Sequence, residues 1–192
     1  MSTQRKPERH YTLEDYYAIE EMSEIKHEYY DGEIFAMVGA SFNHNLIAGN
    51  LFAALKVKLK GTGCDALIND MRVCTSEGLY TYPDIVAVCG KAKLSEDQIK
   101  ALTNPTLIVE VLSESTKRYD RGQKFELYRS IETLREYVLV EQNRIFVERH
   151  EKIQSGDWAR KEYATADATL ELTSIDFRIA LSDIYYRVEF DS

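Results

Sequence analysis

The 192-residue sequence lacks any apolar run that approaches the roughly 20 residues needed to cross a bilayer. Its first ten residues, Met1 to His10, are polar and charged, unlike a signal peptide. We therefore expect a soluble cytoplasmic protein without a membrane segment. Repeats, low-complexity stretches and linkers are also absent, so we expect a flexible N-terminal tail over residues 1–10 and a single domain over residues 11–192.

Cysteine and proline are scarce, at three residues each. Cys64, Cys74 and Cys89 form no Cys-x-x-Cys pair, are odd in number and lie among strand-like residues, which favours reduced thiols in the core. Few prolines, ordinary glycine and an apolar share of 44% indicate a globular chain that is neither fibrous nor disordered.

Positive charge is in deficit, because the formal net charge is −8. This argues against a protein that coats nucleic acid without specificity. It does not exclude a nuclease, since catalytic carboxylates add negative charge that a bound metal partly offsets. Between Glu114 and Lys124 the local balance is positive; a solvated loop and helix start explains this segment as well as a substrate contact does.

Helix and strand signals alternate along the chain. Thr12-Leu13-Glu14-Asp15 matches a capping box that opens a helix, and Asp31-Gly32 between two extendable arms predicts a hairpin. Ser41 can cap a second helix that runs to about Lys60. Further along we expect strands within 64–88, 106–112, 136–140 and 144–148, helices at 95–102 (short and exposed) and 119–131, and short strands before a last helical turn near 182–186. This mixture indicates an α/β fold, an α+β mixed sheet flanked by helices.

Two apolar runs that look like buried strands each carry one carboxylate. Asp84 opens a run that continues to Val88, and Glu110 lies inside residues 106–112 with apolar neighbours on its own face. Because Pro83 cannot donate to a sheet ladder, we expect Asp84 at a strand start or bulge, aimed out of the sheet. An unpaired charge in such a place costs several kcal/mol, so something must compensate it.

Lys124 is the candidate compensating cation. It shares one helical face with Leu127, Tyr128 and Ile131, so it heads the stripe that packs on the sheet. A buried Glu110–Lys124 ion pair without chemistry would explain these two residues equally well. The third charge, Asp84, favours a divalent metal with a lysine beside it, which is the outline of a phosphodiesterase site.

Pro83-Asp84, Glu110-Val111-Leu112 and a following lysine together resemble the PD-(D/E)XK nuclease superfamily. The chain more closely resembles a bacterial, restriction-endonuclease-like branch of unassigned function, over about residues 12–188. The matching segments are Thr12 to Tyr16, Glu28 before Tyr29 to Ile34, Tyr82 to Asp84, Asn104 to Ser113, and Tyr119 to Gly122 leading to Lys124 and Tyr128. The resemblance implies a restriction-endonuclease-like core.

Two residues depart from the pattern. Leu112 stands where the superfamily motif has lysine, and the resemblance implies that the lysine role has moved onto the helix as Lys124. Glu114 stands where this branch usually has proline, which we expect to affect only the turn.

The resemblance also implies a role for each site residue. Asp84, Glu110 and the backbone carbonyl of Val111 would bind Mg²⁺ or Mn²⁺, which suits hard oxygen ligands. Lys124 would orient the attacking water and stabilise charge on the phosphate. Glu28, expected on or just after the first helix, would hold metal-bound water or help to deprotonate it; the alternative is a surface acid.

Other polar residues have simpler explanations. We expect His44 to be a packed, hydrogen-bonded histidine, His27 to be exposed, and Asp120 to cap its helix. Asp70 and Arg72 are expected to form an ion pair that supports a strand end.

The expected function is Mg²⁺-dependent hydrolysis of DNA phosphodiester bonds, by a homodimer if both strands are cut. A catalytically idle module that binds nucleic acid or protein on the same fold is the first alternative, and the acidic composition favours it. A nuclease that acts on RNA is the second.

Overall fold

The computed structural model describes residues 10–37 and 39–190, so residues 1–9 of the expected tail lie outside the described part. Its largest element is a six-stranded sheet in the order β10-β9-β8-β7-β6-β3. These strands are β3 (Cys64–Ile68), β6 (Ile85–Cys89), β7 (Leu107–Leu112), β8 (Glu136–Glu141), β9 (Val147–Lys152) and β10 (Trp158–Tyr163). Only the β7–β8 pair of this sheet is parallel, because a helical crossover joins these two strands.

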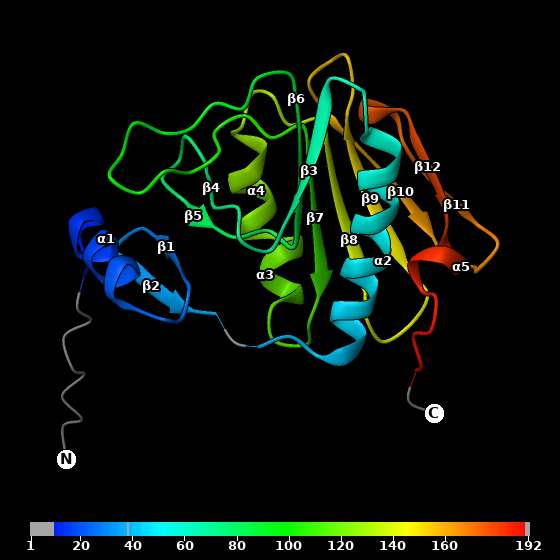
Figure 1. The fold of residues 1–192 in the computed structure, drawn as a ribbon, viewed down its shortest axis with the longest axis horizontal. Coiled ribbons are helices and arrows are strands. Elements are labelled where there is room, and N and C mark those ends of the chain that lie inside the picture. The colour runs from blue at the N-terminus through cyan, green and yellow to red at the C-terminus, as the bar shows by residue number, and fades with distance from the viewer. Residues whose placement is uncertain (1–9, 38, 191–192) are drawn as a thin grey trace.

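Helices cover both faces of this sheet. The long helix α2 (Phe42–Leu59) and the short α5 (Leu181–Ile184) pack on one face, while α3 (Lys117–Arg121) and α4 (Gln123–Arg129) cover the other. Figure 1 shows the sheet in the middle of the molecule with α2, in cyan, running along it. The predicted mixed sheet flanked by helices is therefore confirmed.

The central strand β7 divides the core by alternation. Leu107, Val109 and Val111 pack with α2 in one apolar cluster, whereas Ile108 and Leu112 pack with α4 in another. All six residues of β7 are buried, as the apolar run predicts. Glu110 therefore faces the α3–α4 layer from inside the protein.

A smaller unit precedes the main sheet. Helix α1 (Leu13–Met22) begins with the predicted capping box between Thr12 and Asp15. The hairpin of β1 (His27–Tyr30) and β2 (Glu33–Ala36) turns at Asp31-Gly32, both with positive φ. β1 also pairs with β5 (Tyr80–Thr81), which pairs with β4 (Val73–Cys74), so this small sheet connects directly to the chain that enters β6.

The helix expected over residues 119–131 is two helices. Gly122 separates α3 from α4 with φ −113° and ψ −103°. A Cβ atom there would lie 3.1 Å from the Arg118 carbonyl oxygen, closer than ordinary contact. The break still leaves Lys124, Leu127, Tyr128 and Ile131 buried on one face, as the predicted stripe requires.

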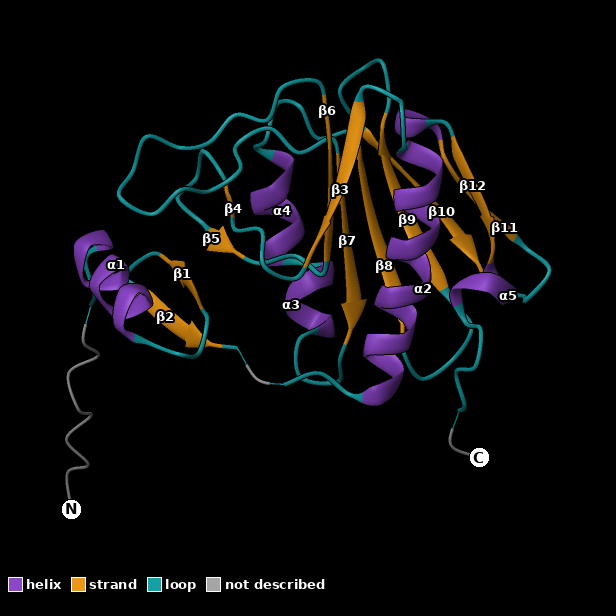
Figure 2. Cartoon of the chain, in the orientation of Figure 1, coloured by secondary structure: helices purple, strands orange, loops and turns teal. Residues whose placement is uncertain are grey.

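Two expectations are wrong. Residues 95–102 form a loop rather than a helix, because Leu102 makes isolated β-bridges with Val73 and Leu94 that bury an extended chain; Figure 2 draws this connection between β6 and β7 as a loop. Cys64 and Cys89 are not reduced thiols: they form a disulfide, since antiparallel pairing of β3 with β6 places them directly opposite each other. Cys74 is free.

The C-terminal part follows the expected order of short elements. β11 (Thr169–Leu172) and β12 (Phe177–Ala180) form a hairpin around a 3₁₀ turn (Thr173–Ile175), and α5 is the expected last helical turn. Over residues 10–37 and 39–190, no helix is long and apolar enough to cross a membrane.

Candidate active site

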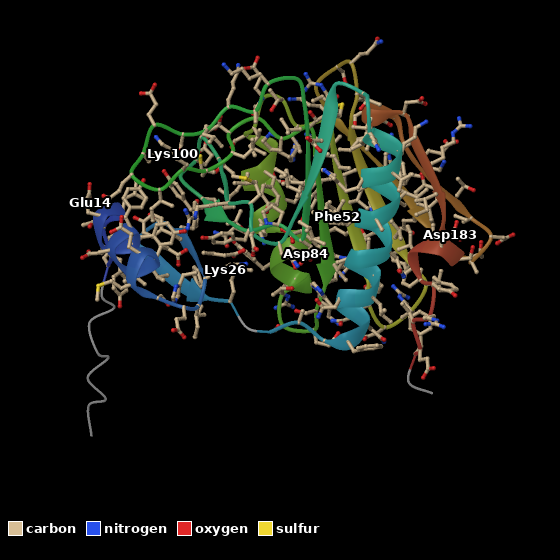
Figure 3. The ribbon with its side chains drawn as sticks, viewed as in Figure 1. Glu14, Lys26, Phe52, Asp84, Lys100 and Asp183 are labelled. Atoms are coloured by element: carbon tan, nitrogen blue, oxygen red, sulfur yellow. A yellow bond between two sulfur atoms is a disulfide. The ribbon has the colours of Figure 1, made fainter. Side chains whose placement is uncertain are left out.

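Asp84 and Glu110 meet at one end of the main sheet. The last paired residues of β6 and β7 are Ile85 and Val109, and Asp84 and Glu110 lie one step beyond that pair. The Asp84 N–H lies 3.4 Å from Glu110 Oε2, and Asp84 Oδ2 accepts a hydrogen bond of 2.7 Å from the Val111 N–H. Asp84 thus sits directly before a strand, as Pro83 predicts, near the middle of the molecule (Figure 3).

Lys124 projects from α4 into a group of acids. Its Nζ lies 2.9 Å from Glu110 Oε1, 2.9 Å from Glu28 Oε1 and 3.6 Å from Asp120 Oδ1. Its side chain is only 6% exposed. The inward direction predicted for Lys124 is confirmed, and three carboxylates share its single ammonium group.

Glu28 lies in β1, not on or just after the first helix as we expected. Strand pairing with β2 and β5 holds this segment extended, and the alternation of β1 turns Glu28 toward the core. Its carboxylate accepts hydrogen bonds from Lys124 and from the Thr81 hydroxyl, and its side chain is 13% exposed. The surface-acid alternative is therefore wrong.

Two residues that we assigned to simpler roles also face this site. His44 is packed and hydrogen-bonded as expected, but its partner is Asp84, with Nε2 3.2 Å from Oδ2. Asp120 makes no helix cap; it lies inside α3, buried against Lys124. The inward phase of His44 with buried Ala48 and Leu51 was the signal that could have placed it here.

Burial and like charge shift the ionisation of the group. Burial raises the pKa of Glu110 to about 8; Lys124 opposes this rise, and Asp120 and Asp84 add to it. Burial likewise raises the pKa of Asp120. For Lys124, burial lowers the pKa, but the surrounding Glu110, Tyr128 and Glu28 outweigh it and hold the pKa well above its usual value. Lys124 therefore stays positively charged, while Glu110 and Asp120 hold their protons to higher pH than free carboxyl groups do.

A second buried network supports the turn that carries Asp84. Glu20 of α1 pairs with Arg72 at 2.8 Å and accepts a hydrogen bond of 2.6 Å from the Tyr82 hydroxyl. Arg72 was expected to pair with Asp70, which pairs with Lys26 instead. His27 is not exposed, because its ring lies 2.9 Å from Glu20. These contacts fix the backbone just before Pro83-Asp84.

The oxygen atoms left free define what this site can bind. Among the described residues, the side-chain contacts of Asp84 involve Oδ2, and the short contacts of Glu110 involve Oε1, while Oε2 accepts only a long hydrogen bond of 3.4 Å from the Asp84 N–H. Asp84 Oδ1 and Glu110 Oε2 are therefore the oxygens with the most capacity left for a cation. No three His, Cys, Asp or Glu side chains within the described residues form a ready-made metal site. Two carboxylate oxygens suit Mg²⁺ nevertheless, because it keeps several waters and needs few protein ligands.

The raised pKa of Glu110 predicts how stability varies with pH when divalent metal is withheld. The unfolded carboxyl loses its proton near its ordinary value of 4.5, whereas the folded one keeps it to about pH 8. The folded state therefore binds more protons in this window, and the free energy of unfolding should fall as pH rises from 5 to 8. Urea unfolding in EDTA at several pH values measures this. Glu110→Gln should show a smaller fall, and an equal fall in both proteins would contradict the assignment.

Comparison with known proteins gives consistent matches. The family model Uma2, described as "Putative restriction endonuclease", matches residues 13–182. In Synechocystis sp., "Uncharacterized protein slr1290" is 37% identical over 178 residues (92% of each chain), and "Uncharacterized protein sll1609" is 35% identical over 163 residues (84% of this chain, 92% of the relative). A crystal structure of "a putative nuclease belonging to DUF820" from Anabaena variabilis matches with TM-score 0.69 and 14% identity, covering 85% of this chain and 91% of that one. At that identity the match shows the fold, which is restriction-endonuclease-like.

Proposed function

The chain belongs to the Uma2 family, described as "Putative restriction endonuclease", and from this premise we propose that it is a divalent-metal-dependent nuclease that hydrolyses phosphodiester bonds of DNA. The observation that carries the proposal is the cluster of acids at the end of β6 and β7. Glu28, Glu110 and Asp120 gather there around a single lysine, and Asp84 lies beside Glu110.

The charges of this cluster favour a cation. Buried carboxylates are tolerated when they are paired, protonated or bound to metal. Lys124 compensates one negative charge among its three acidic neighbours, and the raised pKa of Glu110 indicates that protons compensate part of the rest. A divalent ion beside Asp84 and Glu110 would replace those protons.

Each residue then has a task that its position permits. Asp84 Oδ1, Glu110 Oε2 and the Val111 carbonyl would hold Mg²⁺ or Mn²⁺, and the ion would polarise the phosphate and acidify a water. Lys124 would orient that water and stabilise the charge that develops on the phosphate oxygens. Glu28, held 2.9 Å from Lys124, would accept the proton of the water.

One such site cuts one strand at a time. Cleavage of both strands of a duplex would therefore need two copies, so a homodimer is the form we propose for double-strand cutting. The strongest competing proposal is an idle module that binds nucleic acid or protein. The observation that favours it is that, among the described residues, no three His, Cys, Asp or Glu side chains are arranged so that they could hold one metal ion.

Titration calorimetry with Mn²⁺ tests the proposal directly. The wild-type chain should bind the ion, and Asp84→Asn should bind it at least about tenfold more weakly, because one anionic ligand is lost. Asp65→Asn is the matched control: Asp65 is an aspartate on β3 that pairs with Lys56 and has a 69% exposed side chain. Equal binding by wild type and Asp84→Asn, or no binding by either, would favour the idle module.

The substrate is tested in the same preparation. Supercoiled plasmid and a single-stranded RNA of similar length are incubated side by side with Mg²⁺ or with EDTA. We expect Mg²⁺-dependent nicking of the plasmid. Digestion of RNA alone would assign the site to an RNA nuclease.

A further inference from the structure

His44 touches the site without belonging to the charged group around Lys124. Its ring Nε2 lies 3.2 Å from Asp84 Oδ2, an oxygen that also accepts a hydrogen bond from the Val111 N–H. Asp84 and Val111 are two of the three groups that the proposed function assigns to the metal. His44 therefore contacts that ligand set from α2, on the face of the sheet opposite to Lys124.

The local structure of α2 does not account for this ring. Ser41 caps the helix by accepting a hydrogen bond of 3.1 Å from the His44 backbone N–H, so the imidazole is not needed as a cap. Its Nδ1 is buried and has no hydrogen-bond partner, whereas a histidine kept only for packing usually satisfies both nitrogens. With the proton on Nε2 and none on Nδ1, the ring leaves no donor unpaired and donates toward Asp84.

Lys124 and the His44 ring contact different acids of the site. Lys124 lies within 4 Å of Glu28, Glu110 and Asp120, whereas Asp84 Oδ2 lies 3.2 Å from the His44 ring. If the ring were absent, only the Val111 N–H would hold Oδ2, and the carboxylate could rotate about its Cβ–Cγ bond.

We propose that His44 is a positioning residue that acts through Asp84: together with the Val111 N–H it fixes Oδ2, so that Oδ1 remains directed at the divalent cation. This inference rests on the proposed function, because it concerns how tightly that cation is held. Groups that hydrogen-bond to a metal-ligating carboxylate typically contribute about 10- to 100-fold to metal affinity or activity.

The test compares donor-free and donor-bearing replacements in the full chain. His44→Leu fills similar space without a donor, and His44→Gln carries an amide N–H near the Nε2 position. His150→Leu is the matched control, since the side chains of His150 and His44 are both 13% exposed and His150 lies on β9 beside Phe125. The Mn²⁺ dissociation constant is measured by calorimetry, and urea unfolding verifies that each variant folds.

We expect His44→Leu to bind Mn²⁺ about 10- to 100-fold more weakly, and His44→Gln and His150→Leu to stay within about threefold of wild type. Plasmid nicking by His44→Leu should recover toward the wild-type rate at saturating Mn²⁺, which a general packing defect would not do. If the leucine variant does not fold, His44→Ala serves as the second donor-free variant.

The outcomes separate this inference from the proposed function. Wild-type affinity in a folded donor-free variant, or equal losses in the leucine and glutamine variants, would overturn the role of His44 alone. Failure of the wild-type chain to bind Mn²⁺ would overturn the proposed function, and this inference with it.

Discussion

Lys124→Met should lower the free energy of unfolding by about 3–5 kcal/mol at neutral pH, because removing one partner of a buried ion pair leaves the other uncompensated. Glu28, Glu110 and Asp120 all lie within 3.6 Å of the ammonium group that this change removes. Methionine preserves the length of the side chain, so packing on the sheet changes little. Urea unfolding followed by circular dichroism measures the loss.

The pH dependence of that loss identifies its cause. Without the ammonium group Glu110 and Asp120 hold protons more readily, so the destabilisation should be smaller at pH 5 than at pH 8. Lys117→Met is the control: Lys117 lies on the neighbouring α3 but is 41% exposed and pairs with Glu114 at the surface. Such a pair contributes about 0–1 kcal/mol. Similar losses in the two variants would contradict the central position of Lys124.

Glu110→Gln should reduce Mg²⁺-dependent cleavage by at least about 10³-fold while the protein remains folded. Glutamine retains the oxygen that accepts a hydrogen bond from the Tyr128 hydroxyl, 2.9 Å away, but it cannot supply an anionic ligand. Folding is preserved because burial raises the pKa of Glu110 to about 8, so a neutral group already suits the metal-free site at pH 7. Plasmid nicking and circular dichroism on the same sample check both parts.

A solvent-exposed glutamate provides the control for Glu110. Glu126 lies on α4, pairs with Arg129 and has a 66% exposed side chain, so Glu126→Gln should cleave at the wild-type rate. Undiminished cleavage by a folded Glu110→Gln protein would remove this residue from the mechanism. If the Glu110→Gln protein does not fold, Glu110 has a structural role.

Local signals predicted most elements of the fold. The capping box at Thr12, the Asp31-Gly32 turn and the Ser41 cap each form as expected, because they depend on contacts within a few residues. The buried run around Glu110 and the inward direction of Lys124 were also predictable, since alternation and helical phase determine which side faces the core.

Features that depend on long-range register were not predictable in the same way. The Cys64–Cys89 disulfide requires knowing that β3 pairs with β6 in one particular register. The contact of His44 with Asp84 requires knowing where α2 crosses the sheet. Residues 95–102 carry helix-compatible residues, yet tertiary bridges to Leu102 overrode that local preference.

Sequence predicted the members of the candidate site better than their surroundings. The structure brings together Glu28, Asp84, Glu110 and Lys124, while their catalytic roles stay a prediction. Asp120 was overlooked as a neighbour of Lys124 because an acid near a helix start has a common local explanation as a cap. A buried position at i−4 from an inward lysine was the signal against that explanation.

The pair that joins Glu28 to Lys124 spans 96 residues of chain. During translation the amine therefore leaves the ribosome last, after all the acids of the site. A nascent chain that ends before Lys124 lacks the amine that contacts Glu28, Glu110 and Asp120, so under the proposed function it could not yet hydrolyse DNA. The site could act only after the segment between β7 and β8, which includes α4 with Lys124, has been synthesised and has folded.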